Sequence, residues 1–273
     1  MNGSDYNPAT IQQETIQQET IQQETMGTIL WLTGWSMPNT VFDRLRVLLP
    51  NFHHVSVDYS DADSPEKMLL LTETEARNIP NPDESVCRVR ASRGKPLLIG
   101  GWSLGGLLAL GLACKKLADG LILFGATAQF TRSKEEFDRG WADVYVRQMI
   151  TELTKDRQAV ETKFRRLVFT EAERETDLGQ SLLPIGSWTT PALITGLQIL
   201  RSEECLSQLP TIDCPVLLVH GTEDKICPYS AVSELMDQLP KAKLITIPAS
   251  GHAPFLGREV HIADELRRWW HEQ

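Results

Sequence analysis

The chain has 273 residues, of which 41% are hydrophobic and 23% charged, a composition typical of a globular protein with a substantial core. The net charge of −9, from 27 basic and 36 acidic residues, argues against a nucleic acid or an anionic membrane surface as its main partner. No stretch of about 18 consecutive apolar residues occurs, so we expect no membrane-spanning helix. Five cysteines without a paired spacing indicate free thiols in a reducing compartment, and we expect a cytoplasmic protein.

The N-terminal 25 residues differ from the rest of the chain. Residues 10–25 read TIQQETIQQETIQQET, and a five-residue period matches neither an α-helical face nor a coiled coil. Residues 1–27 contain no lysine or arginine, which a secretory signal needs at its start. We therefore expect a disordered low-complexity tail over residues 1–25, with Met26 as a candidate natural start.

Strands and helices alternate through the remainder. Short apolar runs bounded by Gly, Pro or Asp are typical of strands buried on both faces, and they lie at residues 28–32, 54–57, 96–99, 121–124, 216–219 and 244–247. Helical spacing occurs at residues 41–49, 104–117, 229–239 and 260–270. Because parallel strands need crossover connections, this alternation predicts an α/β fold with a mostly parallel central sheet flanked by helices.

The strand pattern is interrupted once. Residues 126–200 show no strand signal, and charged helical patterning covers residues 137–151 and 157–169. We therefore expect residues 126–200 to form a helical cap, inserted into a single core made of residues 26–125 and 201–273.

A serine in a glycine-rich turn is the first candidate catalytic residue. The pentapeptide GWSLG at residues 101–105 directly follows a predicted strand and directly precedes a predicted helix. A tight strand-turn-helix exposes a serine hydroxyl and leaves no room for side chains two residues away on either side, which explains both glycines. This context favours Ser103 as a nucleophile over the alternative of a plain glycine-rich turn.

A serine nucleophile needs a base held by a carboxylate, in the chain order serine, acid, histidine. Of the six histidines, His252 fits best, because it lies in a glycine-containing loop after a predicted strand. The acid is expected in the loop after the preceding strand, where we choose Asp224 and keep Glu223 as the alternative. Asp224 would orient the imidazole of His252, which would take the proton of Ser103.

The oxyanion that forms during acyl transfer needs two hydrogen-bond donors. We expect the backbone amide of Leu104, directly after the nucleophile, and that of Trp35, in the loop after the first strand. Apolar side chains near these positions would line an acyl pocket, and the candidates are Trp35, Trp102, Phe164 and Trp188. Trp102 has the alternative of packing beneath the turn.

These motifs together resemble a known family. Residues 34–35, 100–106, 196–200 and 252–255 are similar to the α/β-hydrolase superfamily and, within it, to the pimeloyl-acyl-carrier-protein methyl ester carboxylesterases of biotin synthesis. The resemblance implies an α/β-hydrolase fold and a serine carboxylesterase that cleaves a short alkyl (methyl) ester through an acyl-serine intermediate. It also implies an acyl carrier protein as a partner, whereas we expect the enzyme itself to be a monomer.

The chain departs from the family in the oxyanion loop. Many relatives have histidine followed by glycine, whereas this chain has Thr33 before Gly34, so the hydrogen bond that braces the loop must be made differently or be lost. The residues at 58–63 also lack the glycine-rich turn usual after the second strand.

A carrier protein is acidic, so its docking surface should be basic. Residues 155–168 carry five basic and two acidic residues, and the candidates for docking are Lys163, Arg165 and Arg166. The alternative is the solvated face of a charged helix.

Two other functions use the same sequence features. The fold also supports a lyase or a C–C bond hydrolase of the menaquinone-pathway type. A third hypothesis is a non-catalytic hydrolase-like binding protein. The intact set of Ser103, Asp224 and His252 argues against the last. No metal-ligand spacing and no phosphate-binding glycine motif occurs, so we expect no metal and no cofactor.

Overall fold

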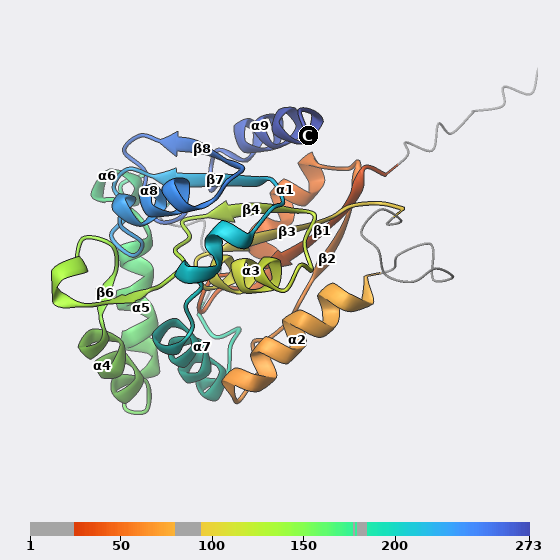
Figure 1. The fold of residues 1–273 in the computed structure, drawn as a ribbon. Coiled ribbons are helices and arrows are strands. Elements are labelled where there is room, and N and C mark those ends of the chain that lie inside the picture. The colour runs from red at the N-terminus through yellow and green to blue at the C-terminus, as the bar shows by residue number, and fades with distance from the viewer. Residues whose placement is uncertain (1–24, 80–93, 177, 179–184) are drawn as a thin grey trace, which may run out of the picture.

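The computed structural model describes residues 25–79, 94–176, 178 and 185–273. The expected tail over residues 1–25 lies outside this part of the chain except for Thr25. Figure 1 shows a central sheet with helices on both faces and a group of helices beyond one end of the strands.

The sheet has the strand order β2-β1-β3-β4-β7-β8, and all neighbouring strands are parallel. The strands are β1 (Gly27–Leu32), β2 (Phe52–Ser56), β3 (Leu97–Trp102), β4 (Gly120–Phe124), β7 (Val216–Gly221) and β8 (Ala242–Ile247). Every residue of β3, β4 and β7 is buried, whereas the edge strands β2 and β8 are partly exposed. This sheet confirms the predicted fold class, because continuous apolar runs suit strands that are covered on both faces.

Two groups of helices cover the sheet. On one face, α1 (Asp43–Leu48) contacts α9 (Glu259–His271). The 3₁₀ turn η1 (Asn39–Phe42) directly precedes α1. On the other face lie α2 (Pro65–Asn78), α3 (Leu104–Cys114) and α8 (Tyr229–Gln238). The helix α2 was not predicted, although its start carries a signal: the Ser64 side chain accepts a hydrogen bond from the amide of Lys67, and a proline occupies the first turn.

The chain between β4 and β7 forms the additional helices near the carboxyl ends of the strands (Figure 1). They are α4 (Asp143–Leu153), α5 (Arg157–Val168), α6 (Glu171–Arg174) and α7 (Thr190–Ser202), followed by the 3₁₀ turn η5 (Leu206–Thr211). The helices α4 and α5 contact each other, and α7 contacts α2, α3 and α4.

One expectation in this segment was wrong. Helical patterning from residue 137 onward predicted a helix over 137–151, but the helix begins only at Asp143. The preceding residues form β6 (Trp141–Ala142), which pairs with β5 (Thr131–Arg132) after the 3₁₀ turn η3 (Lys134–Glu136). Gly140 permits this close pairing, because a Cβ there would lie 2.3 Å from the carbonyl oxygen of Phe130.

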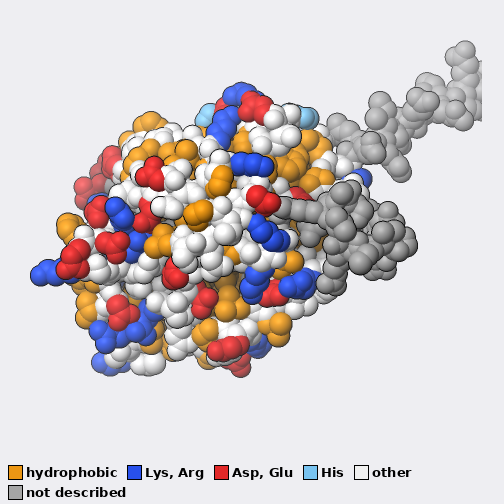
Figure 2. Space-filling view, viewed as in Figure 1, with side chains coloured by type: hydrophobic (Ala, Val, Ile, Leu, Met, Phe, Trp, Pro, Cys, Tyr) orange, Lys and Arg blue, Asp and Glu red, His pale blue; other side chains and the backbone are white. Residues whose placement is uncertain are grey.

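The visible surface is mixed in charge. Figure 2 shows acidic and basic side chains interspersed over the face it presents, so the net negative charge is not gathered into one patch on that face. No helix in the described part of the chain is long and apolar enough to span a bilayer.

Candidate active site

Ser103 lies at a sharp turn between β3 and α3. Its backbone has φ 57° and ψ −117°, a conformation that non-glycine residues adopt at a cost and that clusters at functional sites. The flanking glycines are required sterically, since a Cβ on Gly101 would lie 2.4 Å from the carbonyl oxygen of Gly105, and one on Gly105 would lie 2.0 Å from that of Leu32. The turn therefore has the tight geometry expected from the GWSLG sequence.

His252 and Asp224 form a buried pair at the carboxyl edge of the sheet. The distance from His252 Nδ1 to Asp224 Oδ2 is 2.7 Å, and the other carboxylate oxygen accepts hydrogen bonds from the amides of Ile226 (2.8 Å) and Cys227 (2.9 Å). The carboxylate is thus fixed on both sides, and it orients the imidazole of His252 through Nδ1. His252 Nε2 is buried and has no hydrogen-bond partner among the described residues.

Contacts around the end of β4 bring the serine turn and this pair to the same edge. The amide of Ser103 donates to the carbonyl of Phe124 at the end of β4. At the next residue, Gly125, a Cβ would lie 3.0 Å from His252 Nδ1 and 3.3 Å from Asp224 Oδ2. Ser103 Oγ does not hydrogen-bond Nε2 in this conformation, a contact that often forms only when substrate binds.

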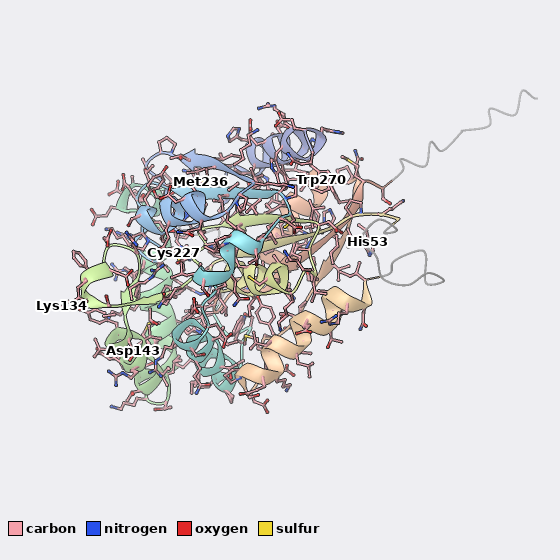
Figure 3. The ribbon with its side chains drawn as sticks, viewed as in Figure 1. His53, Lys134, Asp143, Cys227, Met236 and Trp270 are labelled. Atoms are coloured by element: carbon pink, nitrogen blue, oxygen red, sulfur yellow. The ribbon has the colours of Figure 1, made fainter. Side chains whose placement is uncertain are left out.

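Glu223 and His53 do not take part in this cluster. The side chain of Glu223 is exposed, although its amide donates to the carbonyl of Ser250. Figure 3 places His53 at the amino ends of the strands, far from Cys227, which belongs to the loop that carries the acid. The geometry therefore favours Asp224 over Glu223 as the partner of His252.

The expected oxyanion loop packs directly on the serine turn. A Cβ on Gly34 would lie 3.4 Å from the Cβ of Ser103, which places the loop against the nucleophile. The indole of Trp35 donates to the carbonyl of Leu193 on α7 (2.7 Å). Gly196, one turn further along α7, lets this helix approach Trp35 and Leu104 closely.

A tyrosine braces this loop at Thr33, the position where the family resemblance implies a histidine. The phenol of Tyr59 donates to the carbonyl oxygen of Thr33 (2.6 Å) and accepts from the hydroxyl of Thr33 (3.4 Å). Burial raises the pKa of Tyr59, so the phenol stays protonated and remains a donor. The oxyanion loop is thus stabilised at Thr33 by Tyr59, which lies on the loop that follows β2.

Replacing Tyr59 with phenylalanine is expected to lower the free energy of unfolding by about 1–2 kcal/mol, because the buried Thr33 carbonyl loses a donor. Urea denaturation measures this change. The matched control is Tyr145→Phe, since Tyr145 is 59% exposed on α4. Equal stabilities of the two variants would contradict the bracing role.

The four expected pocket residues are all buried and are used in different ways. Trp188 lines a cavity of about 170 Å³ together with Thr33 and Tyr59. Phe164 packs edge-to-face on Trp35, with ring centroids 4.8 Å apart. Trp102 lies beneath the serine turn, where its indole donates to the carbonyl of His252 (2.8 Å). Trp102 therefore holds the histidine loop, the packing alternative that the sequence had left open.

The expected docking residues separate into two groups. Lys163 and Arg166 are exposed on α5 and line an open hollow of about 710 Å³. Arg165 is only 9% exposed, and its guanidinium donates to the carbonyl of Ser36 (2.7 Å). The expectation that Arg165 forms part of a docking surface is therefore corrected: the side chain points inward because the turn of the helix places it on the buried face of α5.

Two residues near the histidine were missed by the sequence analysis. Glu173 of α6 is buried and accepts hydrogen bonds from the hydroxyl of Ser250 (2.8 Å) and the amide of Gly251 (3.0 Å), which precede His252. A signal was present, because Thr170 and Glu173 form a capping box. The second residue, His220, lies with its Nε2 3.5 Å from Asp224 Oδ2, and burial holds its pKa below the usual range.

Within the ranges that the structure describes, no three His, Cys, Asp or Glu side chains are grouped so that they could hold a metal ion.

The fold and this site define an enzyme of the α/β-hydrolase class. Solved structures share the fold: an esterase from Exiguobacterium antarcticum superposes with a TM-score of 0.69 at 20% identity, covering 90% of this chain and 92% of that one. MenH from S. aureus superposes with a TM-score of 0.68 at 14% identity, covering 91% of this chain and 95% of its own. At these identities the likeness concerns the fold alone.

Comparisons at the level of sequence identify the family to which the chain belongs. The family model described as "Serine aminopeptidase, S33" matches residues 85–259. The pimeloyl-[acyl-carrier protein] methyl ester esterase of Nitrosomonas europaea is 31% identical over 241 residues, which is 84% of this chain and 89% of the relative. The enzyme of that name from Stenotrophomonas maltophilia is 32% identical over 184 residues, covering 66% and 71%. The chain therefore belongs to the α/β-hydrolase family that these esterases represent.

Proposed function

We propose that this α/β hydrolase is a serine carboxylesterase in which Ser103, His252 and Asp224 form the catalytic triad. The observation that carries the proposal concerns the imidazole of His252. Asp224 fixes the ring through Nδ1, while the buried Nε2 lacks a hydrogen-bond partner among the described residues. An imidazole held in this way accepts a proton at one nitrogen, and the strained turn of Ser103 supplies the hydroxyl at the same sheet edge.

The reaction proceeds in two balanced halves. His252 Nε2 takes the proton of Ser103 as Oγ attacks the ester carbonyl, and the amides of Leu104 and Trp35 stabilise the oxyanion. When the tetrahedral intermediate collapses, the C–O bond breaks and His252 protonates the departing alcohol. Water then loses a proton to His252 and attacks the acyl-serine. The bond between the acyl carbon and Ser103 Oγ breaks, His252 returns the proton to Oγ, and the carboxylic acid is released.

The proposed substrate is a short alkyl ester, methyl in particular, at the end of an acyl chain. The names of the curated relatives support an ester of pimeloyl-acyl carrier protein as the specific candidate. A panel of p-nitrophenyl and methyl esters of increasing acyl length tests the chemistry, with mass spectrometry of the intact protein for an acyl adduct. Turnover together with an adduct is expected; no turnover of any ester would overturn the esterase assignment.

The hollow on α5 is the proposed docking site for the carrier. Lys163 and Arg166 line it together with Arg174 and Lys225, and Asp156 is the one acidic residue among those lining it. Lys225 directly follows Asp224, so the hollow adjoins the loop that carries the acid. Acyl carrier proteins are acidic, and complementary charge accelerates association with such a partner.

Reversing both exposed charges, Lys163→Glu with Arg166→Glu, is expected to raise KM for an acyl-carrier-linked ester about tenfold, because like charges then face the acidic carrier. Steady-state kinetics with the carrier-linked ester and with p-nitrophenyl butyrate measures the two cases, and the small ester should be unaffected. The matched control is Lys134→Glu with Lys241→Glu, two exposed lysines elsewhere on the surface. Equal effects on both substrates, or the same effect from the control, would refute docking at this hollow.

A further inference from the structure

A buried charged network lies behind the oxyanion loop. The hydroxyl of Ser36 donates to Glu161 Oε1 (2.6 Å), and Glu161, on α5, is 0% exposed. Arg157 Nε donates to the second carboxylate oxygen of Glu161 (2.7 Å), while Arg165 Nη2 donates to the backbone carbonyl of Ser36 (2.7 Å). Both the side chain and the carbonyl of Ser36 are thus held by one helix.

The helical repeat explains why α5 can do this. Arg157, Glu161 and Arg165 are spaced four residues apart, which places them along one face of the helix. On the same face Phe164 packs against Trp35. The helix therefore holds two consecutive residues of the loop: Trp35 by apolar contact and Ser36 by charge-assisted hydrogen bonds.

Ser36 needs such support because of its backbone. Its φ of 63° lies in the left-handed region, which non-glycine residues occupy only where their surroundings hold them. Gly34, on the other side of Trp35, packs on Trp102 and Ser103. The peptide group that presents the amide of Trp35 therefore lies between two fixed points, the serine turn and the α5 network.

We propose that Glu161 is a positioning residue for the oxyanion hole and acts through Ser36, with Arg157 and Arg165 orienting its carboxylate and the loop carbonyl. The inference rests on the proposed esterase function. A buried ion pair adds little to stability compared with apolar residues of the same volume, so the network is better explained by the loop position it imposes. Stabilisation of an oxyanion depends on donors that are fixed before the reaction, and small displacements of such donors are costly.

The test removes the contact with minimal change. Ser36→Ala deletes one oxygen, Ser36→Gly also relieves the backbone strain, and Glu161→Gln removes the charge while keeping the shape. Each variant is expected to lower kcat for p-nitrophenyl acetate about 10- to 100-fold with KM changed less than about threefold. Binding of a trifluoromethyl ketone, whose tetrahedral adduct places an oxyanion in the hole, should weaken in proportion to kcat.

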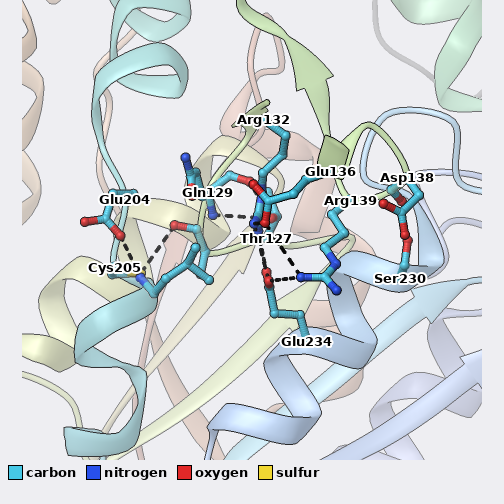
Figure 4. A network of polar contacts seen from close by, with 12 residues as sticks. Thr127, Gln129, Arg132, Glu136, Asp138, Arg139, Glu204, Cys205, Ser230 and Glu234 are labelled. Atoms are coloured by element: carbon cyan, nitrogen blue, oxygen red, sulfur yellow. Dashed lines mark hydrogen bonds and ion pairs between the residues drawn. The ribbon is translucent and has the colours of Figure 1, made fainter. Parts of the chain in front are cut away.

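A second ion pair provides the matched control. Arg132 of β5 and Glu234 of α8 form a largely buried pair, which Arg139 joins and in which no residue of the serine turn takes part (Figure 4). Glu234→Gln removes a comparable charge from a pair whose arginine side chain is fully buried. It should lower Tm to a similar extent as Glu161→Gln and leave kcat and ketone binding unchanged.

The kinetic results distinguish failure of the positioning role from failure of the esterase function. If Ser36→Ala and Glu161→Gln keep kcat within about twofold of the wild type, or if Glu234→Gln loses the same activity, the positioning role is overturned while the esterase function stands. A Ser36→Gly variant as active as the wild type would mean that backbone conformation alone matters, which also overturns it. If the wild-type protein hydrolyses no ester and Ser103 takes no fluorophosphonate label, the proposed function fails, and this inference fails with it.

Discussion

Replacing Ser103 with alanine is expected to lower kcat for short p-nitrophenyl esters by about 10⁴- to 10⁶-fold, because no acyl-enzyme can then form. The fold should survive, since the side chain loses one oxygen and the main-chain hydrogen bond to Phe124 is unaffected. Kinetics with purified protein and mass spectrometry of the peptide that contains Ser103 measure the two consequences.

The control for this change is Ser207→Ala, at an exposed serine in η5. It should retain full activity and the acyl adduct on Ser103. Hydrolysis that persists in Ser103→Ala at the rate of the control would contradict the nucleophile assignment. An adduct found on another residue would identify a different nucleophile.

Asp224→Asn is the second large expected effect, a loss of about 10⁴-fold in kcat. An asparagine can still accept from the amides of Ile226 and Cys227 through its oxygen, which turns its NH₂ group toward His252 Nδ1. The imidazole must then carry its proton on Nε2, where it can no longer accept the proton of Ser103. The effect is therefore on the tautomer of His252 and not on the shape of the site.

Glu223 supplies the control, because it is adjacent in sequence and exposed. Glu223→Gln is expected to change kcat/KM by less than about twofold. Steady-state kinetics of the two variants side by side, with circular dichroism to verify folding, makes the comparison. The opposite ranking would assign Glu223 as the acid and would contradict the geometry at Asp224.

Sequence alone located the strands and the serine turn because these depend on local rules. Apolar runs bounded by Gly, Pro or Asp predicted all six strands of the sheet, and the two glycines around Ser103 follow from crowding within a few residues. His252 and Asp224 could be selected from chain order as well, since the carboxyl ends of neighbouring parallel strands meet at one edge.

Local rules failed where the conformation of a segment depends on its contacts with another segment. Helical patterning over 137–142 was overridden by pairing of β6 with β5, which the close approach of Gly140 to Phe130 permits. The same limit applies to the bracing of Thr33 by Tyr59, which lies on a loop that lacks the glycine-rich turn expected from the family resemblance.

What the sequence by itself determined is the α/β fold and the residue types gathered at the edge of the sheet. Only the tertiary structure decided which charges of α5 face inward. The charge pattern of the helix predicted that Arg165 lies on the surface. A guanidinium can be buried, however, when it has a hydrogen-bond partner. Arg165 donates to the carbonyl of Ser36, 129 residues earlier in the chain. The burial of Glu161 likewise depends on Ser36, 125 residues away, together with Arg157 on its own helix. Such contacts have no local signature, because the free energy that permits them arises only when the two segments pack together.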